Sequence, residues 1–115
     1  MEPLTSATLI KALDGLSLRM TAIAQNVANA GSPRYRPVHV SFEAALKRAA
    51  TMSASAVDQV QPLVTHTRDN ASRSDVRLDL ELADSAMTKE RYGAVAELLA
   101  RELQIDDLVL AGARS

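Results

Sequence analysis

The chain has 115 residues, a net charge of −1 and a sequence pI near 6.1, and it contains no cysteine. The absence of cysteine excludes disulfides and thiolate metal sites. The net charge and pI argue against a protein that coats nucleic acid or an acidic membrane surface. Hydrophobic residues make up 47% of the chain but aromatic residues only 3%, which is little for the core of a self-sufficient small domain. We therefore expect one domain, residues 1–115, whose helices complete their burial against other chains.

The start of the chain lacks the features of a cleavable export signal. Met1–Leu4 has neither a basic start nor an unbroken apolar core, and no stretch approaches the roughly 20 apolar residues that span a bilayer. The sequence predicts no membrane insertion. It predicts either a cytoplasmic location or export by a route without a cleaved signal.

A long amphipathic helix is predicted over residues 5–30. Its apolar residues recur at alternating spacings of four and three, a 3.5-residue average over about three heptads. This seam is typical of a helix that packs along another helix, and it consists of Leu9, Leu13, Leu16, Met20, Ile23, Val27 and Ala30. Gly15 beside the seam either allows a neighbouring backbone to approach closely or is simply exposed.

The helix is expected to end at a corner within Gln25–Tyr35. Gly31 is expected to take the positive φ of a helix C-cap, and Pro33 prevents the helix from resuming. Asn26 and Asn29 are poor helix formers, so we expect their amides to bond to the following loop or to a neighbour. The corner motif therefore comprises Asn26, Asn29, Gly31, Pro33 and Tyr35.

Residues 31–78 are predicted to hold the corner, a short helix and an extended arm. Val38–Val40 alternates like a short strand, and Ser41 is expected to cap a helix over 42–50. Residues 51–70 lack helical periodicity and are interpreted as a linker, an extended arm or a small β-element.

A second long helix is predicted over residues 79–111. Alternation from Val76 to Leu82 favours a strand, but the Ala-, Leu- and Glu-rich composition beyond Leu80 favours a helix, so we expect an extended lead-in to about Leu78. Gly112 would then close the helix. Its apolar packing positions include Met87, Val95, Leu99 and Leu103. The predicted fold is mainly α, with two long terminal amphipathic helices packed as an antiparallel coiled-coil-like pair.

No constellation of side chains indicates catalysis. His39 and His66 lie at no metal-ligand spacing, and the carboxylates of Asp106 and Asp107 point about 100° apart on a helix. We therefore predict no catalytic, cofactor-binding or metal-binding residues. Arg34, Arg36, Lys47 and Arg48 form a modest basic cluster around Tyr35, which we interpret as subunit-contact or solvated charge in preference to a nucleic-acid site.

The corner resembles a signature of the bacterial flagellar axial proteins, the family of rod, hook and hook-associated proteins. In that family an N-terminal helix closes with an Asn-x-x-Ala-Asn segment and a Thr-Pro-Gly-Tyr-like turn, which Asn26–Tyr35 matches except that Ser32 replaces threonine and Arg34 replaces glycine. The short chain, the helix after the turn and the segment Val76–Glu81 are most similar to the proximal-rod members.

The resemblance implies a structural protein that is not an enzyme. Such subunits order their terminal helices on assembly into a helical shaft across the periplasm, and they leave the cell through the type III export apparatus without signal cleavage. The expected partners are copies of the chain, other rod proteins, and the basal-body junction protein and export gate at the rod base. No nucleic acid is expected.

A soluble helical adaptor or regulator that dimerises through the same seam, and binds nucleic acid through the basic cluster, is the alternative. The asparagine-rich corner favours the rod subunit, because a generic coiled coil does not need it.

Overall fold

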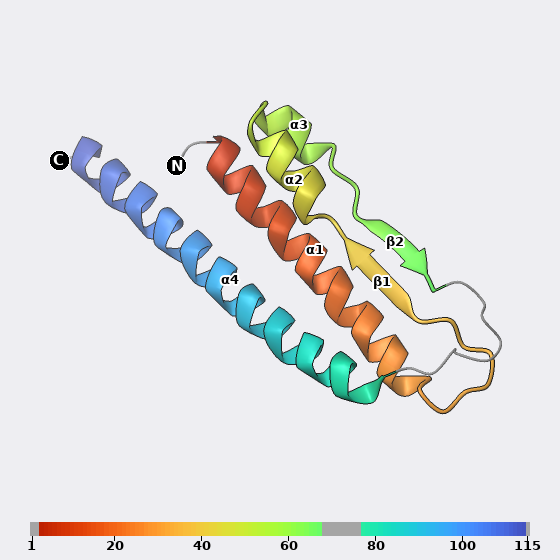
Figure 1. The fold of residues 1–115 in the computed structure, drawn as a ribbon. Helices are drawn as coiled ribbons and strands as arrows, with labels where there is room; N and C mark the ends of the chain where they lie inside the picture. Colours follow the sequence, from red (N-terminus) through yellow and green to blue (C-terminus); the bar gives the residue numbers. More distant parts are fainter. Residues whose placement is uncertain (1–2, 68–76, 115) are drawn as a thin grey trace.

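The computed structural model describes residues 3–67 and 77–114, and it is mainly helical. In chain order the elements are α1 (Pro3–Ala28), β1 (Val38–Ser41), α2 (Glu43–Ala50), α3 (Ala54–Asp58), β2 (Leu63–His66) and α4 (Leu78–Arg114) (Figure 1). The two long helices, the short α2 and the first strand are thus present as predicted.

The molecule is elongated, with extents of 67 × 26 × 14 Å. The helix α4 lies alongside α1, and the two chain termini lie at the same end of the molecule (Figure 1). At that end α4 continues past the start of α1. The elements β1, α2, α3 and β2 lie on the other side of α1 from α4.

The bounds of both long helices differ from the predicted ones. The first runs over 3–28 where 5–30 was expected, because proline is well placed in a first helical turn and Asn29 already belongs to the corner turn. The helix α4 begins at Leu78 and passes through Gly112 to Arg114, so Gly112 does not close it.

Two local predictions between the long helices were wrong. Ser41 does not cap α2, because it belongs to β1; Phe42 holds the N-cap position, and its N–H is 3.3 Å from the Glu43 carboxylate. The helix α3 was not predicted, since five residues are too few to display a helical period. Its N-cap is Ser53, whose hydroxyl oxygen accepts a hydrogen bond from the N–H of Ala56.

The strands β1 and β2 form an antiparallel pair in which Val38 faces His66 and Ser41 faces Leu63. Of the three interpretations of residues 51–70, a linker, an extended arm or a small β-element, β2 matches the last. All of β2 is exposed, whereas Val40 on β1 turns into the core.

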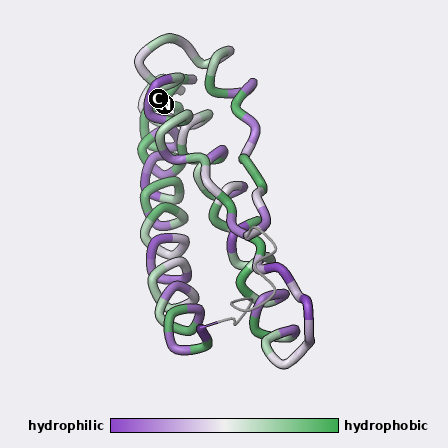
Figure 2. The backbone as a smooth tube through the Cα atoms, turned by 45° about the vertical axis from the view of Figure 1, so that its right-hand side comes forward, coloured by the Kyte–Doolittle hydropathy of each residue, from purple (hydrophilic) through white to green (hydrophobic). Residues whose placement is uncertain are grey.

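The core lies mainly between α1, β1, α2 and α3. Tyr92 and Val95 of α4 are half-buried at its edge. The buried cluster comprises Leu16, Ala22, Val40, Phe42, Leu46, Ala49, Val57 and Val60. Figure 2 shows polar and apolar residues alternating along α4, and none of the described helices is long and apolar enough to cross a membrane.

The buried stripe of α1 is rotated by about one residue from the predicted seam. Its buried residues include Gly15, Ala22 and Asn26, each the neighbour of a seam residue. Leu16 and Ile23 belong to both sets. The reason is that β1 and α2 cover α1 in addition to α4. The most enclosed face of α1 therefore lies between α4 on one side and β1 and α2 on the other.

Gly15 is buried against a side chain, not against a neighbouring backbone. A Cβ built at Gly15 would lie 2.5 Å from Cδ1 of Phe42. The aromatic ring therefore packs directly on the helix backbone, and only glycine leaves room for it.

Candidate functional site

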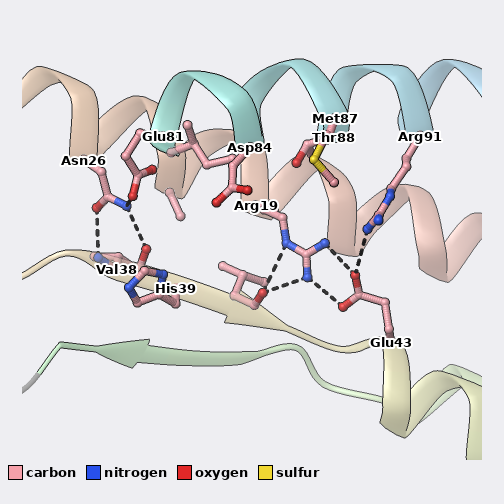
Figure 3. Close-up of a pocket in the computed structure, with 13 residues that line it drawn as sticks. Arg19, Asn26, Val38, His39, Glu43, Glu81, Asp84, Met87, Thr88 and Arg91 are labelled. Atoms are coloured by element: carbon pink, nitrogen blue, oxygen red, sulfur yellow. Dashed lines mark hydrogen bonds and ion pairs between the residues drawn. The ribbon is translucent and has the colours of Figure 1, made fainter. Parts of the chain in front are cut away.

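The side chain of Asn26 joins three parts of the fold although it is only 1% exposed. Its Oδ1 accepts hydrogen bonds from the Val38 N–H and the Tyr35 hydroxyl, each at 2.8 Å. Its Nδ2 donates to the Val38 carbonyl at 2.9 Å and to Oε1 of Glu81 at 3.2 Å (Figure 3). One amide thus connects the end of α1 with the corner, with β1 and with α4.

Asparagine suits this position because its amide offers a donor and an acceptor, as a peptide group does. It can therefore satisfy the N–H and the carbonyl of Val38 in the way that a neighbouring strand would. A buried side chain that makes four hydrogen bonds also avoids the cost of an unsatisfied polar group. The prediction that Asn26 bonds to the following loop is confirmed.

Glu81 and Tyr35 complete this junction from opposite sides. Glu81, near the start of α4, is 8% exposed and accepts the second hydrogen bond from the Asn26 amide. Partial burial raises the pKa of the Tyr35 hydroxyl above its ordinary value, and the nearby Glu81 carboxylate raises it further. The hydroxyl therefore stays a hydrogen-bond donor to Asn26.

Arg19, two turns earlier on α1, forms a second junction with β1 and α2. Its guanidinium donates to the Val40 carbonyl at 3.2 Å and 2.8 Å and to both carboxylate oxygens of Glu43 at 2.6 Å (Figure 3). It also lies 5.0 Å from the centre of the Phe42 ring, a cation–π distance. Arg91 of α4 approaches Glu43 to 3.9 Å.

The charge of Glu43 is stabilised by this contact. Hydrogen bonding from Arg19 lowers the pKa of Glu43 to about 2, against the effect of partial burial. The same hydrogen bond raises the pKa of Arg19, and Asp84 on α4 adds to that increase. The pair therefore remains ionised at all ordinary pH values.

Together Asn26 and Arg19 occupy the edge of β1 that faces away from β2. Backbone groups of alternate residues in an antiparallel strand point to opposite edges. Those of Val38 and Val40 point to α1 and are bonded by the two side chains. No buried side-chain nitrogen or oxygen in the described part of the chain lacks a hydrogen-bond partner.

A cleft of about 330 Å³ lies between α1, β1 and α4 beside these junctions. It combines acids and bases, including Asp84 and Arg91, with the nonpolar side chain of Met87 (Figure 3). Within residues 3–67 and 77–114, no three His, Cys, Asp or Glu side chains are placed to hold a metal ion. The hydrogen bonds of Arg19 and Asn26 join different elements. Such a network sets the position of the helices relative to the strand.

The other corner residues do not join this network. Within residues 3–67 and 77–114, the Asn29 side chain donates only to the Gln25 carbonyl of its own helix, at 2.8 Å, and not to the following loop as predicted. Gly31 and Pro33 are exposed, and Gly31 does not have the predicted positive φ. Arg34 has it instead, with φ of 67°, in the left-handed region that favours glycine.

The predicted packing residues are enclosed to different degrees. Leu16 and Ile23 are buried; Leu9, Leu13, Met20, Val95 and Leu99 are half-buried. Val27 is 36% exposed, Met87 49% and Leu103 50%, so these three leave much apolar surface free within the described chain. The basic cluster is not assembled, because Lys47 and Arg48 lie on α2, beside the first half of α1 and away from the corner (Figure 1).

Sequence reasoning missed Arg19, Glu43 and Glu81. Arg19 carried a usable signal, since it interrupts an otherwise small or apolar face of α1. Glu81 carried none, because the alternation of Val76–Leu82 groups it with the charged residues, opposite the apolar ones.

No protein-family model matches the chain, and no curated protein shows significant similarity to it.

Proposed function

We propose that the chain is a structural subunit of the proximal rod of the bacterial flagellar basal body, most similar to flagellar basal-body rod protein B. The observation that carries the proposal is the junction at Asn26. Asn26 and Tyr35, which belong to the corner motif that carries the resemblance, bond to each other, and Asn26 also bonds to β1 and α4. The motif thereby positions both terminal helices relative to each other.

The backbone of Arg34 also supports the proposal. The family turn has glycine where this chain has Arg34, and a positive φ is the conformation for which glycine is preferred. This chain thus differs from the family in its residue at this position, while its backbone has the conformation that a glycine would adopt.

The exposed apolar surface of the long helices supports a role in assembly. Leu103, Leu108 and Leu110, in the last part of α4, are at least 50% exposed. At this end of the molecule α4 continues past the start of α1 (Figure 1). Exposed apolar surface of this kind marks contacts with other proteins. We propose that α1 and α4 form the antiparallel coiled-coil-like pair of the subunit, and that copies of the chain and other rod proteins cover the remaining surface.

The proposed subunit has no catalytic role and binds no nucleic acid. It is located in the periplasmic rod, is exported by the type III apparatus without signal cleavage, and meets the basal-body junction protein and the export gate at the rod base.

Circular dichroism and sedimentation of the purified chain over a concentration series test the proposal against a dimeric adaptor. A rod subunit is expected to gain helicity as it assembles and to form a series of species. A fully helical, discrete dimer at micromolar concentration would contradict the proposal and favour the adaptor.

A further inference from the structure

An apolar groove of about 390 Å³ lies between α1, α2 and α4 and borders the Arg19 junction at Glu43 and Arg91. Its walls include Ala12 and Leu16 of α1, Leu46 of α2 and Val95 of α4. Two cations border it, Lys47 on α2 and Arg91 on α4; Glu43 also borders it but is bound through both carboxylate oxygens by Arg19. The groove is thus an apolar floor with a basic residue on each of two walls.

The end of α4 has the complementary pattern. Leu103 and Leu110 are seven residues apart, so they share one face of the helix, and they are 50% and 53% exposed. Asp106 and Asp107 lie between them in the sequence, and at about 100° per residue they flank the leucine face on its two sides. Residues 102–113 contain three acidic residues and no basic one.

We propose that residues 103–110 of a second copy of this chain occupy the groove, with Leu103 and Leu110 on its floor and Asp107 beside Lys47. The occupant cannot be the chain's own tail, because Leu110 is roughly 20 Å further along the same helix than Val95, at ~1.5 Å per residue. Groove and tail are different surfaces, so the contact is heterologous and propagates from copy to copy.

For its biological role this inference rests on the proposed function, since it supplies a contact between adjacent copies in a rod. The contact itself is a property of the purified chain. It can therefore be tested separately from incorporation into a flagellum.

The test exchanges charges between the two surfaces of the full-length chain. In Lys47→Glu the altered groove repels the acidic tail, and in Asp107→Lys the altered tail repels the basic groove. Sedimentation velocity over a concentration series should show each variant self-associating about tenfold more weakly than the original chain. An equimolar mixture should recover the association, because each variant's groove then meets a tail of opposite charge.

Two leucines of the same tail provide a matched pair. Leu110→Ser should weaken association about tenfold or more, because it removes a floor contact. Leu108→Ser should leave association unchanged, because Leu108 is 73% exposed on the opposite side of the helix. Unchanged circular dichroism of the dilute variants establishes that neither substitution disrupts the fold.

A chain that stays monomeric, single charge variants that associate normally, or a mixture that fails to recover would each overturn the inference. If the mixture recovers but the chain is absent from isolated basal bodies, the contact stands and the proposed function fails. If the chain is present there but the charge exchange has no effect, the function stands and the contact fails.

Discussion

At the scale of single residues, the buried amide of Asn26 connects α1 with the corner, β1 and α4. Asn26→Asp removes the donor to the Val38 carbonyl and to Glu81, and it buries a second carboxylate beside that of Glu81. We expect the free energy of unfolding to fall by about 3 kcal/mol. Urea unfolding followed by circular dichroism measures the change.

Asn29→Asp is the matched control for that measurement. The Asn29 side chain donates to a carbonyl of its own helix near the surface, so the loss should be less than about 1 kcal/mol. Equal losses of unfolding free energy in Asn26→Asp and Asn29→Asp would mean that the buried junction does not account for the effect at Asn26.

Glu43 predicts a specific dependence of stability on pH. Its pKa is lowered from 4.5 to about 2 in the folded chain, so its ionised form stabilises the fold above pH 4.5. That contribution is lost as the pH falls from 4.5 through about 2. Because the side chain is 50% exposed, solvent screening limits the contribution to about 1 kcal/mol.

The measurement is urea unfolding of the original chain and of Glu43→Gln between neutral pH and pH 2. The variant should be less stable by about 1 kcal/mol at neutral pH. This difference in unfolding free energy should shrink toward zero as the pH approaches 2. A difference that does not change with pH would show that the ion pair with Arg19 is not its source.

At the scale of elements, the packing of Phe42 on Gly15 fixes how closely β1 and α2 approach α1. Gly15→Ala would place a methyl group against a buried ring that Arg19 holds from another side. Overpacking costs about 1–3 kcal/mol and the better helix propensity of alanine returns up to about 1, so we expect a net loss of about 1–2 kcal/mol.

Gly93→Ala gives the opposite expectation in α4. Nothing lies within 4 Å of a Cβ at Gly93, so alanine should stabilise the helix by up to about 1 kcal/mol. Thermal unfolding should show a lower melting temperature for Gly15→Ala and a higher one for Gly93→Ala. A stabilised Gly15→Ala would mean that the Phe42 ring does not rest on the helix backbone.

At the scale of the whole molecule, the elongated shape and the exposed seam residues favour assembly over an isolated globule. Val27 lies in the predicted seam, yet it is 36% exposed in the single chain. We expect Val27→Asp to leave the dilute chain folded and to abolish its incorporation into the rod, because the charge would be buried against a neighbouring subunit.

Recovery of the variant chain in isolated basal bodies is the readout. Ala28→Asp, an adjacent exposed position outside the seam, is the control and should still be incorporated. Normal incorporation of Val27→Asp would contradict the packing role assigned to the seam.

The sequence by itself determined the elements whose signals are local. Apolar periodicity predicted the first long helix and composition predicted the second. Alternation predicted β1, and the corner residues predicted the end of α1 to within two residues. The asparagine at position 26 also showed that a side-chain bond was needed there, because asparagine is unfavourable within a helix unless its amide has a partner.

Only the tertiary structure decided which face of α1 is buried and which side chains meet. The heptad pattern predicted one helical partner, but β1 and α2 cover α1 too, so Gly15 and Ala22 are buried while Val27 stays partly exposed. The contacts Asn26–Glu81 and Arg19–Glu43 join residues that are distant in the chain. Their physical basis is the meeting of separate elements, on which local periodicity carries no information.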